Sequence, residues 1–408
     1  MHKQNRIYLI IGIVIQGFIF PLVSAQAQAI KIPDIVAWHS GKALPIAIES
    51  NDSTVRSLAT KAFKTHGQYK VVKPSQAGYI FDLKRTGANT VTLAIRSGPS
   101  RQIRQSKRVT GSGWVEATLR ACDFAVTQTS RLPGYFAGRL VFVGERTRHK
   151  ELFVSDLFFQ RVQQVTHDRS ESLFPRWSPD GKKILYTGYF HSGFPDIFLL
   201  DLKTERRMPF ATYKGINTSA SFSPKGDLIA MTLSHGNNPE IYITDTRGRI
   251  VRRLTRVPSI ETSPTWSPNG RHIIMTSDIK GKPQLYQIKS KGGKMRRIPT
   301  NISGYCAEPA WNSRNEDQIV FTAAMGKTFQ LALYDAKKRK SRFLTRGPGD
   351  AIEGRWTNDG RHIIYTQRQG RAKRLMIIDS ESGKTTPLHS PSLGQASQSD
   401  FVYVQSSR

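Results

Sequence analysis

The pentapeptide Trp177-Ser178-Pro179-Asp180-Gly181 recurs along the chain. Related copies begin at Phe222, Trp266, Trp311 and Trp356, so the leading aromatic residue advances by 45, 44, 45 and 45 residues. Each copy continues into a β-branched run such as Ile184-Leu185-Tyr186-Thr187, and two further short runs complete each unit. Asp-Gly and Asn-Gly between such runs favour tight hairpins, and four short strands at this period are typical of β-propeller blades.

The count of strands predicts how the ring closes. A further unit, from Leu140 to Thr166, supplies three strands without a leading aromatic strand. In complete units the aromatic residue follows the end of the previous unit by about eleven residues, and the same distance beyond His389 reaches residues 400–405. We therefore expect a six-bladed β-propeller over residues 132–408, in which residues 400–405 close blade one and remove an exposed sheet edge.

The residues before the propeller divide into three segments. Residues 1–25 have a basic start, an apolar run and small residues at the end, which is the pattern of a secretory signal peptide. Residues 26–43 show no period and are expected to be an N-terminal arm. Residues 44–131 alternate strand-like runs with two amphipathic segments, near 53–67 and 114–130, and predict a small α/β domain. The fold class is thus mainly β, with an α/β domain before the propeller, in an exported protein.

Charge is the unusual feature of the composition. The 408 residues include 61 Lys and Arg against 30 Asp and Glu, a formal net charge of +31. The basic residues are dispersed and not interleaved with stacking aromatics, so we expect no nucleic-acid partner. Attraction to an anionic envelope surface is one interpretation, and a generally solvated basic surface is the other.

Linear signatures of enzymes are absent from the sequence. It has no Gly-x-Ser-x-Gly elbow, His-Glu-x-x-His, Walker A loop, EF-hand spacing or Cys-x-x-Cys pair. We therefore expect no enzyme activity, no catalytic residue, no cofactor and no bound metal. The alternative is a propeller enzyme or carbohydrate-binding protein with a metal-assisted site in the channel, similar to a polysaccharide lyase, because a ring of blades can gather distant residues.

Four glutamates stand out against the basic background. Glu171, Glu261, Glu308 and Glu353 precede the leading aromatic residues by three to six positions, in segments that should rim the central channel. We predict that they form an acidic partner-binding site, distinct from basic surfaces beyond a Debye length of about 8 Å. The competing interpretation is a set of loop carboxylates paired with nearby arginines.

These features together resemble the TolB family of the Tol–Pal envelope system. The resemblance rests on Trp177-Ser178-Pro179-Asp180-Gly181 and its copies, the six units, the preceding α/β domain and the export signal. It implies a monomeric, non-enzymatic periplasmic adaptor that maintains envelope integrity and supports outer-membrane constriction at division. It also implies that a Pal-like peptidoglycan-associated lipoprotein binds at the channel mouth, near the four glutamates. A TolA-like inner-membrane protein would recognise the arm, residues 26–43.

Overall fold

The computed structural model describes residues 43–146, 148–235 and 238–405. These residues belong to one compact unit. The expected signal peptide and all but the last residue of the expected arm lie outside the described residues.

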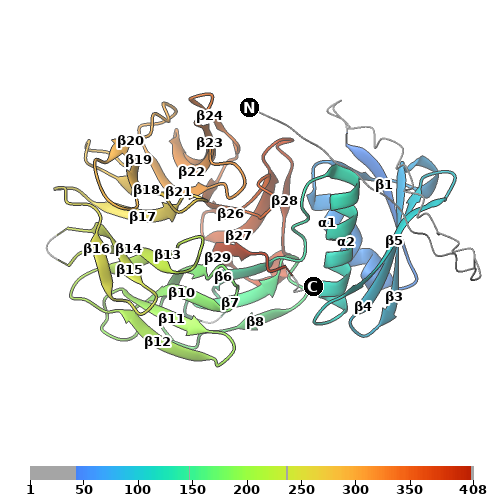
Figure 1. Cartoon of the computed structure of the whole chain (residues 1–408), viewed down its shortest axis with the longest axis horizontal. Helices are drawn as coiled ribbons and strands as arrows, with labels where there is room; N and C mark the ends of the chain where they lie inside the picture. Colours follow the sequence, from blue (N-terminus) through green and yellow to red (C-terminus); the bar gives the residue numbers. More distant parts are fainter. Residues whose placement is uncertain (1–42, 147, 236–237, 406–408) are drawn as a thin grey trace, which may run out of the picture. The chain divides into compact units, whose positions relative to one another are not determined.

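The first domain is a five-stranded sheet covered by two helices (Figure 1). The sheet has the order β2-β1-β3-β4-β5, in which β1 runs parallel to both neighbours and the other pairs are antiparallel. Its strands are β1 (Leu44–Ser50), β2 (Tyr69–Val71), β3 (Tyr79–Gly87), β4 (Thr90–Ser97) and β5 (Ile103–Thr110). A short 3-10 helix, η1 (Pro74–Gln76), precedes β3.

The two helices begin and end where the local sequence provides caps. Helix α1 (Ser53–Thr65) follows Asp52, whose side chain accepts hydrogen bonds from the backbone N–H groups of Thr54 and Val55. Helix α2 (Trp114–Ser130) ends at Arg131, which adopts the left-handed conformation. The apolar faces of both helices pack on the sheet, with Phe63 fully buried. Neither has the length and apolar character needed for a membrane crossing, a statement limited to the described residues.

Six four-stranded antiparallel sheets form the propeller in the described residues (Figure 1). The first blade combines β29 (Ala396–Val402), β6 (Arg139–Gly144), β7 (Glu151–Asp156) and β8 (Val162–Gln164). The next two are β9 (Ser172–Trp177), β10 (Lys183–Gly188), β11 (Asp196–Asp201) and β12 (Arg206–Ala211), then β13 (Asn217–Phe222), β14 (Leu228–Leu233), β15 (Glu240–Asp245) and β16 (Ile250–Arg253). The fourth contains β17 (Glu261–Trp266), β18 (His272–Ser277), β19 (Gln284–Lys289) and β20 (Arg296–Arg297). The last two are β21 (Cys306–Trp311), β22 (Gln318–Met325), β23 (Thr328–Asp335) and β24 (Lys340–Phe343), then β25 (Asp350–Trp356), β26 (His362–Gln369), β27 (Ala372–Asp379) and β28 (Thr385–Pro387), with η2 (Pro391–Leu393) before β29.

The predicted fold class is confirmed: the chain is mainly β, with six blades after a small α/β domain. The closing strand β29 pairs with β6, from Ala396 opposite Gly144 to Val402 opposite Arg139. It therefore covers 396–402 and not the expected 400–405. The strand starts four residues earlier than expected and includes Gln398, Ser399 and Asp400, which line the channel.

The repeated residues hold neighbouring blades together. Trp266 and Trp356 are buried, and their indole N–H groups donate to Ser221 O and Ala310 O of the preceding blade, both at 3.1 Å. Trp177 packs in a core shared by the first two blades. The glycine of the turn is required there, because Gly181 has φ +67°.

Candidate functional site

A ring of six residues lines the channel at one position of every innermost strand. The ring residues share a left-handed backbone conformation, with φ between 49° and 59°, although none is glycine. Each lies three residues before the leading aromatic residue, at a register shift in its strand. They are Phe174, Ser219, Ser263, Glu308, Glu353 and Gln398. Such a conformation costs about 1 kcal/mol or more per residue, so compensating contacts must hold each bulge.

Three of these side chains supply such contacts by reaching the next blade. Glu308 Oε2 accepts from the backbone N–H of Glu353 at 3.2 Å, and Glu353 Oε2 accepts from that of Gln398 at 3.2 Å. Gln398 Oε1 then accepts from the backbone N–H of Phe174 at 3.0 Å. The chain of hydrogen bonds crosses the point where the ring closes, so these acceptors support the fold as well as lining the channel.

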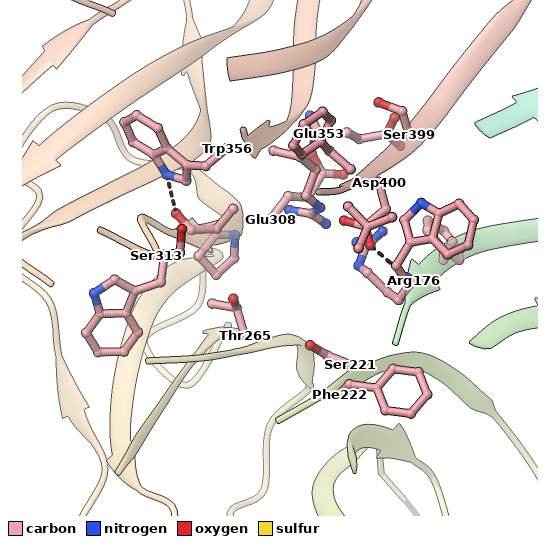
Figure 2. A pocket seen from close by; sticks show the side chains of 18 of the residues that line it. Arg176, Ser221, Phe222, Thr265, Glu308, Ser313, Glu353, Trp356, Ser399 and Asp400 are labelled. Atoms are coloured by element: carbon pink, nitrogen blue, oxygen red, sulfur yellow. Dashed lines mark hydrogen bonds between the residues drawn. The ribbon is translucent and has the colours of Figure 1, made fainter. Parts of the chain in front are cut away.

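The residues around the channel enclose a cavity of about 380 Å³. A second ring, two residues beyond the first, supplies Arg176, Arg355 and Asp400 together with uncharged residues. Figure 2 shows Glu308, Glu353, Asp400 and Arg176 around the same space. Asp400 Oδ2 accepts from the backbone N–H of Trp177 at 2.8 Å. The described cavity lining thus carries three carboxyl groups and two guanidinium groups.

Burial dominates the electrostatics of the cavity. It raises the pKa of Glu353 from the ordinary 4.5 to about 7, and the neighbouring Glu308 carboxylate adds to the rise. Burial also raises the pKa of Asp400, against the opposing effect of Arg176. The cavity is therefore less negative near pH 7 than its count of carboxyl groups suggests.

The four predicted glutamates do not all converge. Glu308 and Glu353 meet in the cavity, as the expectation required. Glu171 lies in the connection before β9, partly exposed and paired with Lys150. Glu261 is fully buried in its own blade, where Oε1 accepts from Ser259 Oγ at 2.6 Å and Ser277 Oγ at 2.7 Å. The reason is depth along the strand: the positions three and one before the aromatic residue line the cavity, whereas Glu171 and Glu261 lie six and five residues before it.

Sequence reasoning missed the other channel residues. Phe174, Ser219, Ser263 and Gln398 are chemically unrelated to the glutamates, so a search for charge passed over them. The repeat itself held the signal, because all six ring residues occupy one column when the blades are aligned on the aromatic residue.

Glu353→Gln should make the free energy of unfolding less dependent on pH. The raised pKa means that the folded chain holds this proton more tightly than the unfolded chain. The stabilisation is full below pH 4.5 and is lost as the pH rises towards 7. Glutamine stays neutral, so we expect a gain of about 1–3 kcal/mol at pH 8 and none at pH 4, measured by urea denaturation. Glu171→Gln is the control, and a gain equal at both pH values would contradict the assignment.

The residues that could hold a metal lie elsewhere. Among the described residues, the group of His, Cys, Asp and Glu side chains close enough for this is His66, His362 and Asp379. They are outside the cavity. The alternative of a metal-assisted channel site calls for histidines there, and the described lining residues include none.

Comparisons with known proteins agree with this architecture. The family described as "TolB beta propeller domain" matches residues 127–400. The Tol-Pal system protein TolB of Alcanivorax borkumensis is 32% identical over 116 residues, 28% of this chain and 26% of that protein. The TolB of Cereibacter sphaeroides strain ATCC 17029 is 40% identical over 95 residues, 22% of this chain and 21% of that protein. These alignments span about a quarter of the relatives' length.

A solved structure extends the likeness to most of the chain. The crystal structure of TolB from Acinetobacter baumannii superimposes with a TM-score of 0.76 and 23% identity, over 88% of this chain and 97% of that one. At this identity the match concerns the fold. The family match covers more than half of the chain and includes every complete blade, so the chain belongs to the TolB β-propeller family.

Proposed function

We propose that the chain is a non-enzymatic periplasmic adaptor of a Tol–Pal system. In this role it binds a Pal-like lipoprotein at one mouth of the channel and a TolA-like protein through residues 26–43. It thereby helps to maintain the envelope and its constriction at division. The family match carries the proposal, and the relatives' names associate them with the Tol–Pal system.

The chemistry of one propeller face supports a protein partner there. Loops between second and third strands and connections between blades share this face, because the strands of each blade alternate in direction. Three exposed apolar side chains lie on it: Phe194 (65% exposed), Ile216 (41%) and Ile260 (49%). Phe194 and Ile216 are neighbours, because the next residue after each takes part in one hydrogen bond. The Asn217 N–H donates to Pro195 O at 2.9 Å. Exposed apolar groups rimmed by polar residues mark interaction sites.

Basic residues also lie on the outermost strands of the blades, away from the channel. The outermost strands of four consecutive blades carry basic residues that are exposed or half-exposed: Arg206, Arg207, Arg252, Arg253, Arg296, Arg297, Lys340 and Arg342. These lie on the perimeter, where attraction to an anionic envelope surface would act. The connections at the channel mouth include Glu171, whose side chain is partly exposed, whereas Glu308 and Glu353 line the cavity inside.

Phe194→Asp combined with Ile260→Asp should weaken binding of the soluble domain of a Pal-like lipoprotein by about tenfold or more. A charge placed in an apolar contact has to be desolvated on binding, and central apolar residues carry most of the binding energy. Surface plasmon resonance measures the change, and circular dichroism confirms the fold.

Val251→Asp is the matched control for this pair. Val251 is 51% exposed on the perimeter strand β16, so the substitution has the same chemistry away from the mouth. Equal affinity of the mouth variant and the wild type would place the Pal-like partner on another surface.

A further inference from the structure

Two histidines from different domains meet inside the protein. His66 follows helix α1 in the small domain, and His362 is the first residue of β26 in the sixth blade. Their ring centroids are 4.6 Å apart, with planes at 69°. Asp379, the last residue of β27, lies opposite His362 in the strand register. All three side chains are fully buried.

The ligand atoms of this cluster have nearly the spacing of a metal site. One nitrogen or oxygen atom from each residue lies within 4.8 Å of the other two. His362 Nε2 and Asp379 Oδ2 are 3.7 Å apart. Tetrahedral zinc, with bonds of about 2.0–2.1 Å, holds its ligand atoms about 3.4 Å apart. Side-chain movements of less than about 1 Å would therefore bring the three atoms to coordination distance.

Hydrogen bonds already orient one of the imidazoles. His362 Nδ1 lies 2.6 Å from Asp359 Oδ2, so the carboxylate engages Nδ1 and Nε2 is the ring nitrogen left to face the cluster. Metal-binding histidines commonly have such a carboxylate behind them. The ring of Tyr135 stacks on His362 with centroids 4.4 Å apart and helps to exclude water.

Three buried polar atoms here have no hydrogen-bond partner among the described residues. They are His66 Nε2, His362 Nε2 and Gln68 Oε1. His66 Nδ1 accepts a long hydrogen bond, 3.3 Å, from the Gln68 N–H. A metal on His66 Nε2 would place the imidazole proton on Nδ1, and the unpartnered Gln68 Oε1, two residues along the chain, would have to turn towards Nδ1 to accept it. Unpartnered buried groups are costly, and a metal ion would satisfy them together.

Carboxylates outnumber guanidinium groups in the cluster. Its carboxylates are Asp359 and Asp379, the Arg361 guanidinium pairs with Asp379, and the Arg361 backbone N–H donates to Asp359 Oδ1. Arg361 Nε donates to Asp379 Oδ1 and Nη2 to Oδ2, both at 2.8 Å, which leaves one lone pair of Oδ2 for another cation. The buried group thus combines two carboxylates with one guanidinium, an arrangement that can accept a further cation.

We propose that His66, His362 and Asp379 bind one Zn²⁺ ion, which ties the small domain to the propeller. Two imidazoles and one carboxylate suit zinc and other borderline metals better than Mg²⁺ or Ca²⁺. The proposed zinc site is separate from the channel, so the zinc-binding experiment can fail or succeed without bearing on the adaptor role. Entry of the metal requires the domain junction to open, so binding is slow.

The sequence offers a matched control in another blade. Residues 269–274 (Asn-Gly-Arg-His-Ile-Ile) repeat residues 359–364 (Asp-Gly-Arg-His-Ile-Ile), and His272 begins β18 as His362 begins β26. Opposite His272 the strand register places Lys289 in the position of Asp379. His272 therefore has the same local sequence without the carboxylate of the proposed site.

The experiment uses the untagged chain, stripped with a chelator and loaded with ZnCl₂ both when folded and during refolding. After gel filtration, elemental analysis should find one zinc per chain in the wild type and in His272→Gln. His66→Gln should bind at least ~100-fold more weakly and Gln68→Ala about tenfold more weakly, by competition with a chromogenic chelator. Mg²⁺ and Ca²⁺ should not be retained. No retained zinc in the wild type, or equal affinity in His66→Gln, overturns the proposal.

A second readout covers the case in which His66→Gln does not fold. The wild-type chain loaded with Co²⁺ should show the intense visible absorption of a tetrahedral site, and excess Zn²⁺ should abolish it. A spectrum with only the weak bands of octahedral Co²⁺ overturns the proposal. A protein that becomes more stable at acid pH without retaining any metal also overturns the proposal. In that case a proton bound by the cluster, and not a metal ion, would supply the positive charge.

Discussion

A chain that ends at Gly394 should lose its cooperative unfolding transition or melt at least ~10 °C below the full chain. The truncation removes β29, the innermost strand of the first blade, and exposes the backbone of β6. It also removes Val402, whose buried side chain fills part of the core shared with the second blade. The loss of a whole inner strand is comparable to the total stability of a typical domain, about 5–15 kcal/mol.

The cost extends beyond the blade that β29 completes. Gln398 donates its backbone N–H to Glu353 of the sixth blade and accepts from Phe174 of the second. Asp400 accepts from Trp177. Without β29, these hydrogen-bonding groups of the sixth and second blades therefore lose their partners.

Calorimetry on two truncations tests this. The control ends at Val404, beyond β29, and should lose little stability. Gln398→Ala should fall between them, because it removes one interblade acceptor worth about 1–2 kcal/mol. A peptide of residues 395–404 added to the chain ending at Gly394 should restore the transition by strand addition. If the truncated chain melted at the same temperature as the full chain, the stability of the ring would not depend on this closure.

The blades were predictable because each is a local meander. The period of the aromatic residues, the Gly turns and the β-branched runs all act within one unit, and the number of units follows from counting. The start of β29 was not predictable from apolar character, since residues 397–400 are polar, and Gln398, Ser399 and Asp400 line the channel. Hydrophobic patterning identifies strands that face a core and misses strand segments that face an aqueous channel.

The candidate site was predictable only in part for a related reason. Glu308 and Glu353 were found because they carry charge, and they occupy the ring position. Glu261 carries the same charge two residues earlier relative to its aromatic residue, which turns it into the blade. Charge marks a residue as notable, whereas the position along the strand decides what it faces.

Contacts between segments that are far apart along the chain leave no pattern in the sequence. Asp379 stabilises a turn, because its side chain accepts from the Glu381 N–H at 2.9 Å. Nothing in the sequence shows that its second oxygen faces His362, or that His66, far away in the chain, lies beside both. Such groupings depend on how the two domains pack, which is a property of the folded chain.

Asp123→Ala should destabilise the protein by about 3–5 kcal/mol, the largest effect that we expect from a single substitution. Asp123 is buried on helix α2 and accepts three hydrogen bonds. The donors are the backbone N–H groups of Phe136 at 2.7 Å and Ala137 at 3.0 Å, and the Tyr403 hydroxyl at 2.9 Å. Alanine would leave two buried backbone N–H groups without an acceptor, each costing about 1–3 kcal/mol.

The three donors come from the linker between the domains and from the segment after β29. The substitution should therefore loosen the linker as well as lower the free energy of unfolding of the whole protein. Gly134 lies so close to Asp123 that a Cβ atom there would approach its side chain to 2.3 Å, which shows how tightly the linker is held. Trypsin should therefore cut at the exposed Arg131 faster in Asp123→Ala than in the wild type, below the melting temperature. Tyr403→Phe removes one donor and leaves both backbone groups satisfied, so it should cost only about 1 kcal/mol. Equal cleavage rates in Asp123→Ala and Tyr403→Phe would mean that the linker is held by apolar packing around Phe136, with the carboxylate contributing little.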